Sequence, residues 1–244
     1  MNPSPVYDSV TQTIFLLFIT VRGEVAEEHQ INTQTNSVRL CQITSIDQVK
    51  TWSSLTDLTD AVFGSAHGEW ATFADGPGHG LQLSDENRTL VIPAYAHRIQ
   101  GQRARPVPHA FCICSPAHGK SWVKGGFVDT ASAVECRVVE IVQIGGHALL
   151  YCNARSDQGM SVQALSYTHG VDFADGRLVK KLVKEPRGCH GSVVGFRLHE
   201  KASLGSDPDG SPLFCCLFEC GDDSEYERLD FMMFTFRQIL QSVC

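Results

Sequence analysis

Three short segments of this chain share a turn motif, and its recurrence limits the folds that the chain can adopt. The first segment, residues 45–52, reads S-x-D-x-x-x-T-W, and degraded copies follow at 115–122 and 166–173. Each copy lies between segments with the composition of β-strands. A turn that recurs at one place in successive sheets is typical of a radial β-repeat.

The chemistry of the motif suits a hairpin turn. Asp47, at the third position, can accept hydrogen bonds from backbone N–H groups of the turn. Gly119 and Gly170, two positions later in the other copies, supply a positive φ. The first copy has Val49 there; if that position is left-handed, a β-branched residue costs about 1–2 kcal/mol. We expect the closing aromatic residue to wedge between neighbouring sheets.

Short β-rich runs bounded by Gly, Asp, Asn or Pro dominate the chain and predict an all-β fold. Helical periodicity is limited to short turns near residues 55–62 and 238–243. Strands without intervening helices exclude a parallel α/β fold, which leaves a sandwich or a propeller. The repeated turn favours the propeller. The predicted strands are 13–21, 38–44, 90–95, 110–114, 134–143, 148–153, 162–166, 192–198, 213–219 and 231–236.

Size and charge exclude some functions. At 244 residues the chain fits one domain with a sizeable core. Its net charge of −7 argues against nucleic acid as a partner and gives no attraction to anionic lipid. The apolar run 14–19 is too short to span a bilayer, and no secretory signal is visible. We therefore expect a cytoplasmic protein.

The ten cysteines carry little functional signal. Without an oxidising compartment we expect them to be reduced and mostly to act as small buried hydrophobes. Cys112 and Cys114, two positions apart on a predicted strand, should share one face. Zinc sites built from Cys112, Cys114 and His118, or from Cys215, Cys216 and Cys220, lack paired ligand spacing. No metal or other cofactor is expected.

With the turn motif in place, the chain resembles the vertebrate exo-α-sialidases over nearly its whole length. The resemblance implies a six-bladed sialidase-type β-propeller, incomplete in this chain, in one domain spanning 1–244 with an internal gap near 203–210. Cys216–Gly221 and Val21–Gly23 look most like the membrane-associated ganglioside sialidases, which implies possible peripheral membrane association. The other matching blocks are Met1-Asn2-Pro3, Arg39-Leu40-Cys41, Gly76-Pro77-Gly78-His79, Ile92-Pro93-Ala94-Tyr95, Val134-Glu135-Cys136, Asn153-Ala154-Arg155 and Gly191-Ser192-Val193-Val194.

The resemblance implies a chemistry as well. Sialidases hydrolyse terminal α-linked sialic acid from glycolipids or glycoproteins with retention, through a tyrosine nucleophile activated by a glutamate. Glu135 matches that glutamate, and Arg155 matches one member of an arginine triad that binds the sialate carboxylate. Tyr95, Glu27 and Asn2 match pocket positions, and His97 stands where some relatives carry a second tyrosine.

The chain also departs from the family pattern. It opens inside the family domain, so the first triad arginine and the general-acid aspartate are expected to be missing. The blocks around Leu198 and Asp209 lie close together, whereas relatives have a long segment between them with the third arginine and a Tyr-Ser-Asp block. None of the five tyrosines lies in such a block. We therefore expect a truncated or spliced form with impaired or no hydrolysis.

Two other functions compete with hydrolysis. A propeller that keeps half of a pocket can bind a sialoside, or a protein, without turning it over. An unrelated WD or kelch interaction propeller is disfavoured, because the chain lacks the Trp-Asp dipeptide and the kelch double-glycine spacing.

Overall fold

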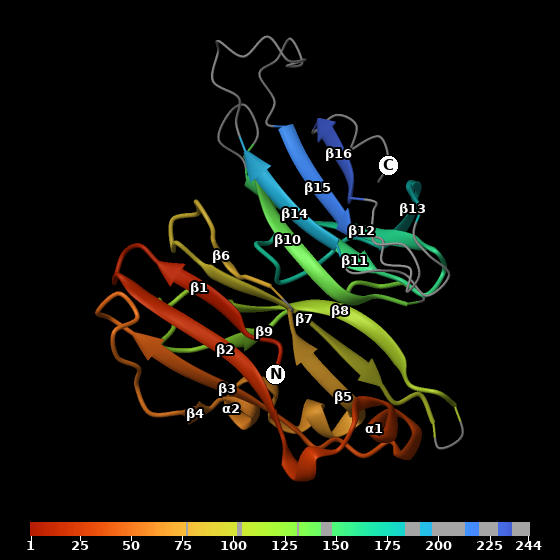
Figure 1. Ribbon diagram of the computed structural model, residues 1–244, viewed down its shortest axis with the longest axis horizontal. Coiled ribbons are helices and arrows are strands. Elements are labelled where there is room, and N and C mark those ends of the chain that lie inside the picture. The colour runs from red at the N-terminus through yellow and green to blue at the C-terminus, as the bar shows by residue number, and fades with distance from the viewer. Residues whose placement is uncertain are drawn as a thin grey trace.

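The computed structural model describes residues 1–76, 78–101, 104–130, 132–142, 148–183, 191–196, 213–219 and 229–235. These residues form four antiparallel sheets that follow one another along the chain (Figure 1). The internal gap expected near 203–210 and the helical turn expected near 238–243 lie outside the described residues.

Each sheet is a meander whose neighbouring strands are consecutive in sequence, apart from the short strand β6, which pairs with β7. The first sheet contains β1 (Ser4–Asp8), β2 (Thr13–Val21), β3 (Val38–Ser45) and β4 (Thr56–Asp57). The second contains β5 (Trp70–Asp75), β6 (Leu81–Gln82), β7 (Leu90–Arg98), β8 (Val107–Ser115) and β9 (Val123–Lys124). The third contains β10 (Val134–Val142), β11 (Ala148–Arg155), β12 (Met160–Ser166) and β13 (Arg177–Val183), and the fourth β14 (Gly191–Phe196), β15 (Leu213–Glu219) and β16 (Leu229–Thr235).

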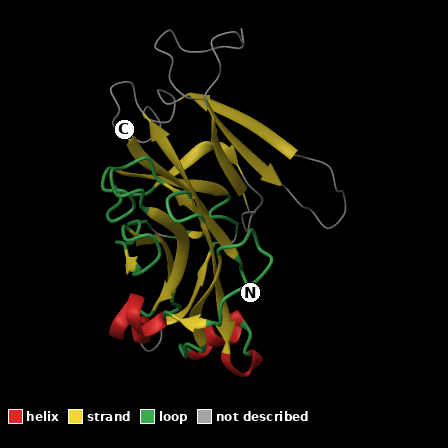
Figure 2. Cartoon of the chain, turned by 90° about the vertical axis from the view of Figure 1, so that its left-hand side faces the viewer, coloured by secondary structure: helices red, strands yellow, loops and turns green. Residues whose placement is uncertain are grey.

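Helices are few and short. The α-helices are α1 (Glu27–Thr33) and α2 (Thr59–Phe63), accompanied by the 3-10 turns η1 (Arg22–Glu24) and η2 (Gly64–Glu69). Figure 2 shows the helices gathered at one end of the sheets. In the described part of the chain, no helix is both long and apolar enough to cross a bilayer. The four meander sheets agree with the propeller prediction rather than the sandwich.

Two hydrophobic cores fill the spaces between successive sheets. The first core lies between the first and second sheets and includes Phe15, Leu17 and Trp70. The second lies between the second and third sheets and includes Cys112 and Cys114, which share a face as predicted. The second sheet is thus covered on both sides. The five cysteines whose side chains are described, Cys41, Cys112, Cys114, Cys136 and Cys152, are buried and free, as expected.

The three repeated turns occupy equivalent places. They join β3 to β4, β8 to β9 and β12 to β13, the third and fourth strands along each sheet. In every turn the fourth and fifth residues have a positive φ. The fifth residue's N–H donates to the opening serine hydroxyl in each turn, Val49 to Ser45 at 3.0 Å, Gly119 to Ser115 at 2.8 Å and Gly170 to Ser166 at 2.9 Å. Asp47 accepts hydrogen bonds from the backbone N–H and hydroxyl of Thr51, at 2.9 and 2.6 Å.

The second and third turns also tie their sheet to the preceding one. Trp122 packs edge-on against Phe15 of the first sheet, with ring centroids 6.0 Å apart, and its Nε1 donates to Gln42 Oε1 at 2.7 Å. Phe173 packs on the second core. The wedge expected of the closing aromatic is therefore found twice. It is not found for Trp52, which stays 40% exposed.

A histidine in the same turns faces an aspartate of the preceding sheet. His118 Nδ1 lies 3.1 Å from Asp8 Oδ2, and His169 Nδ1 lies 3.9 Å from Asp85 Oδ2. Burial raises the pKa of Asp8, but hydrogen bonds from Thr11, Val10 and Gln82 and the nearby His118 outweigh it and the pKa falls below its usual value. The repeat thus includes a polar contact between sheets as well as the turn.

Substituting Val49 by glycine should stabilise the fold. Val49 has a φ of 60° and is half exposed, so the change relieves left-handed strain and removes little buried surface. After allowance for the unfolded-state entropy of glycine, we expect the free energy of unfolding to rise by roughly 0.5–1 kcal/mol in urea titrations. Gly119→Val is the matched control: its φ is 74° and an added Cβ would collide with Phe15, so it should destabilise. A loss of stability in Val49→Gly would contradict this account.

Candidate active site

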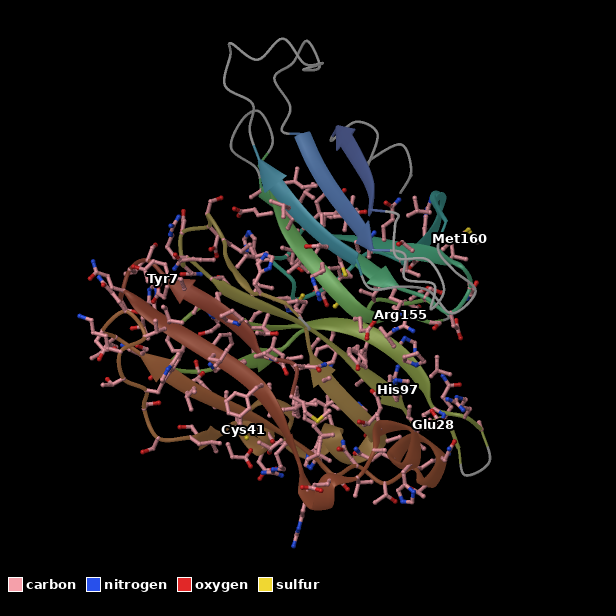
Figure 3. All side chains as sticks on the ribbon, in the orientation of Figure 1. Tyr7, Glu28, Cys41, His97, Arg155 and Met160 are labelled. Carbon is pink, nitrogen blue, oxygen red and sulfur yellow. The ribbon has the colours of Figure 1, made fainter. Side chains whose placement is uncertain are left out.

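Four of the five predicted site residues line one cavity of about 720 Å³ at the end of the second and third sheets. Helix α1 contributes Glu27, β7 contributes Tyr95, and β10 and β11 contribute Glu135 and Arg155. Figure 3 shows the labelled residues Glu28, His97 and Arg155 along the same side of the molecule. Residues as far apart in the sequence as Glu27 and Arg155 therefore face the same cavity.

Glu27 is placed by the start of a short helix. It is the first residue of α1, which begins without a side-chain cap and carries two acidic residues in its first turn, where the helix dipole favours them. Tyr95 OH donates to Glu27 Oε1 at 3.1 Å. Burial raises the pKa of Glu27; the Tyr95 hydrogen bond lowers it, while the charges of Glu135 and Glu28 raise it further. Glu27 therefore takes up a proton more readily than an exposed glutamate.

Glu135 is aimed into the cavity by an irregularity in β10. Its φ is 38°, and the β10–β11 register shifts between Val134 and Arg137, as in a β-bulge. Val134 pairs with Arg155 across the strands. This brings Arg155 Nη1 to 2.7 Å from Glu135 Oε2, with side chains 31% and 23% exposed, respectively. Such a part-buried pair holds both side chains in one geometry.

Tyr95 is held as a neutral phenol. Burial raises its pKa, and so do the charges and hydrogen bond of Glu27 and the charge of Glu135. A phenol in this state donates hydrogen bonds and is a poor nucleophile. Among the other described tyrosines, Tyr7 and Tyr167 are exposed elsewhere and Tyr151 is buried on β11 with its OH 3.3 Å from Gln163 Oε1. Tyr226 lies outside the described residues.

Two further contacts form the rim of the cavity. Arg105 Nη2 lies 3.1 Å from Glu28 Oε2, which ties α1 to the loop before β8. Burial lowers the pKa of His97 to about 4, and the charge of Arg105 lowers it as well. The His97 imidazole, whose ring centroid is 6.0 Å from that of Tyr95, is therefore neutral at physiological pH. Glu28 and Arg105 carried no sequence signal beyond the adjacency of Glu28 to Glu27.

Asn2 lies in a second, mostly apolar cavity of about 440 Å³, which shares Glu27 and Tyr95 with the first. Its φ of 52° is left-handed, a conformation that asparagine tolerates. The structure thus brings Glu27, Tyr95, Glu135 and Arg155 together around the larger cavity and places Asn2 in the adjoining one. Their roles toward a ligand stay predictions. Nowhere in the described ranges do three or more His, Cys, Asp or Glu side chains gather closely enough to hold a metal ion.

Comparison with known proteins defines the class first. The sequence signature of the BNR repeat-like domain matches residues 1–201. Among solved structures, the Hadza microbial sialidase Hz136 superposes with a TM-score of 0.69 at 20% identity, over 95% of this chain and 42% of that one. Trypanosoma rangeli sialidase in complex with the inhibitor DANA gives 0.65 at 14%, over 96% and 37%. The chain spans less than half of these proteins, and the fold is a sialidase-type propeller.

The family follows from closer relatives. Sialidase-2 of Cricetulus griseus is 40% identical over 296 residues, covering 100% of this chain and 77% of that protein. Sialidase-3 of Homo sapiens is 42% identical over 203 residues, 81% of this chain and 47% of that protein. Sialidase-4 of Homo sapiens is 43% identical over 201 residues, 80% and 41%. The chain belongs to the sialidase family.

Removing the Tyr95 hydroxyl should reveal its link to Glu27. Tyr95→Phe deletes a hydrogen bond to a part-buried carboxylate, so we expect the free energy of unfolding at pH 7 to fall by about 1.5–3 kcal/mol. In a double-mutant cycle with Glu27→Ala, which removes the acceptor, the two losses should not add, because either change deletes the same hydrogen bond. Denaturant unfolding of the four proteins measures this. Strictly additive losses would show that the two side chains are not coupled.

Proposed function

We propose that the larger cavity is a sialoside site of the exo-α-sialidase type. Its ligand would be a terminal α-linked sialic acid carried by a glycolipid or glycoprotein. The observation that carries the proposal is that one cavity combines an arginine–glutamate pair, Arg155–Glu135, with a tyrosine–glutamate pair, Tyr95–Glu27. Membership of the sialidase family supports the substrate class.

The residues have separate tasks in this proposal. The planar guanidinium of Arg155 suits the carboxylate of the sugar, which must replace Glu135 as its partner. Tyr95 and Glu27 offer a donor and an acceptor for hydroxyl groups of the ligand. Glu135 is the base of a retaining mechanism, in which a phenol attacks because a carboxylate nucleophile would be repelled by the anionic sugar.

We further propose that hydrolysis by this chain is impaired or absent. Glu135 needs a phenol to activate, and the sequence holds no Tyr-Ser-Asp block. Tyr95 is the one tyrosine lining the cavity among the described residues, and its raised pKa makes it a donor rather than a nucleophile. The second candidate function, a sialoside-binding propeller without turnover, is favoured by these same observations.

We also propose a position for the chain within the sialidase family. We infer that the chain acts nearest to the membrane-associated ganglioside sialidases, as a peripheral membrane protein, on the strength of the blocks 21–23 and 216–221. The identities to Sialidase-2, Sialidase-3 and Sialidase-4 are within a few per cent of one another, but the Sialidase-2 alignment covers 100% of this chain and the Sialidase-3 and Sialidase-4 alignments of Homo sapiens cover 81% and 80%.

Hydrolysis and binding are separated by one set of variants. A fluorogenic sialoside tests turnover, and we expect the native chain to release fluorophore no faster than Glu135→Gln. Titration with a sialic acid analogue tests binding. Because Glu135→Gln removes the negative charge that pairs with Arg155, we expect it to bind the anion more tightly, by roughly tenfold for about 1.4 kcal/mol.

Arg155→Met is the matched variant, since it keeps an apolar stem and removes the charge. It should abolish saturable binding while leaving the unfolding midpoint within a few degrees of native. Turnover well above the Glu135→Gln background would refute the impaired state and support hydrolysis. Binding that is equally strong in Arg155→Met, or no binding by any variant, would refute the sialoside site.

A further inference from the structure

Asp75 is a buried carboxyl group beside the site that the proposed chemistry does not use. It ends β5, the strand at one edge of the second sheet, and pairs with Ala94, while its neighbour Ala74 pairs with Tyr95. Its side chain is fully buried. Neither carboxyl oxygen makes a hydrogen bond of ordinary geometry, and neither does the buried Ser4 hydroxyl, although this hydroxyl lies near enough to Asp75 to favour its ionised form somewhat.

The local packing seals this group at the junction between the first two sheets. Ser4 begins β1 of the first sheet, and the backbone of Gly76 crosses so closely that an added Cβ would lie 2.5 Å from Ser4 Oγ. Gly76 also has a φ of 60° and donates its N–H to Pro93 O at 2.7 Å. A charge enclosed in this way is costly unless it is paired, so the carboxyl favours its protonated form.

The surrounding groups do not supply a pair. On β1, Ser4 is polar but uncharged, and Asp8 at the far end is engaged with Thr11 and Gln82. The terminal ammonium of Met1 donates to Ile19 O at 2.8 Å. Arg137 of β10 lies against Gly78, and its charge together with burial lowers the pKa of His79, which leaves His79 neutral. Tyr95 of β7 is a neutral phenol bonded to Glu27.

The direction of the pKa agrees with this environment. Burial raises the pKa of Asp75 to about 7, although the Ser4 hydroxyl, the backbone N–H of Asp75 and the Met1 ammonium each lower it somewhat. A neutral carboxyl can donate its O–H to the Ser4 hydroxyl. An ionised one leaves a negative charge between β1 and β5, and separating these strands to admit water relieves it.

We propose that Asp75 is a proton-linked positioning residue at the β1–β5 junction, where Ser4 meets Asp75 and Gly76. Protonated Asp75 holds this junction closed, and ionised Asp75 loosens it. The junction supports Asn2, two residues before Ser4, and Tyr95, paired with Ala74. Proton uptake therefore favours the assembled cavity. Only this link to the cavity rests on the proposed function; the junction itself does not.

The sign of the pH dependence follows from the two protonation states. The unfolded carboxyl loses its proton near its ordinary value of 3.8 and the folded one near 7. Between these values the folded state holds one proton more than the unfolded state, so stability falls as the pH rises and then levels off above pH 7. Most buried carboxylates that have partners show the opposite trend.

Thermal unfolding at a series of pH values tests the proposal. Asp75→Asn keeps the shape and removes the titration, so the midpoint of the variant minus that of the native chain should grow by on the order of 5–10 °C between pH 5 and pH 8. Glu86→Gln, an exposed site on the β6–β7 loop, is the matched control and should run parallel to native. Ser4→Ala removes one of the groups that lower the pKa of Asp75, so the unfolding midpoint of this variant should continue to fall to a higher pH than that of the native chain.

Hydrogen exchange, corrected for intrinsic rates, locates the effect. At pH 8 the amides of β1 should exchange faster than at pH 6 in the native chain and not in Asp75→Asn. Parallel midpoint profiles for native and Asp75→Asn, or β1 exchange that does not depend on the Asp75 proton, would overturn the proposal. Neither measurement involves a sialoside, so failure of the sialoside site leaves this test standing.

Discussion

Burial of the second sheet on both faces is the constraint on which the rest of the structure depends. Along β7, Leu90, Ile92 and Ala94 face the first core, while Val91 faces the second. A slip of one residue in this strand would exchange the two sets and spoil both cores at once. Nine consecutive pairs join β7 to β8, so the register is fixed where the packing demands it. The positions of Tyr95 and His97 at the site follow from that register.

The repeated turns and the site lie at opposite ends of the sheets. Leu90, where β7 begins, pairs with Ser115, which opens the second turn, whereas Arg98 at the other end pairs with Val107. Tyr95 belongs near that second end, as do Arg155 at the end of β11 and Glu135 near the start of β10. The turns therefore connect and space the sheets without reaching the cavity. A motif that identifies the fold so clearly says nothing by itself about the chemistry.

Much of the fold was accessible from the sequence because its signals are local. All ten predicted strands appear, with ends shifted by a few residues. Six strands of the described structure were not predicted: β1, β4, β5, β6, β9 and β13. β5 was missed because Trp70–Asp75 mixes alanine, threonine and a buried aspartate, and α1 was missed because seven residues without a cap show no helical period. The helical turn predicted near 55–62 is found as α2, which begins a few residues further along the chain, at Thr59. These short elements are defined by what they pack against rather than by their own propensities.

The sequence identified residues of the candidate site but not the contacts between them. Family resemblance singled out Glu27, Tyr95, Glu135 and Arg155, but no spacing in the sequence shows that Glu27 meets Tyr95 or that Glu135 meets Arg155. The second contact depends on a bulge and a left-handed residue, which a pattern of alternating side chains does not reveal. Asp75 illustrates the same limit, because a lone aspartate after Ala74 becomes informative only once its burial is known.

The Glu135–Arg155 pair depends on a strained backbone conformation. A left-handed φ at a non-glycine residue is strained, and such strain persists only where the surroundings impose it. Here the bulge imposes it, and the ion pair at 2.7 Å holds the result. An anionic ligand that takes Arg155 would leave Glu135 beside a second negative charge, Glu27. If the cavity is the proposed sialoside site, binding should be easiest when one of these carboxylates gains a proton, so we expect anion affinity to be linked to proton uptake through the charges of the cavity.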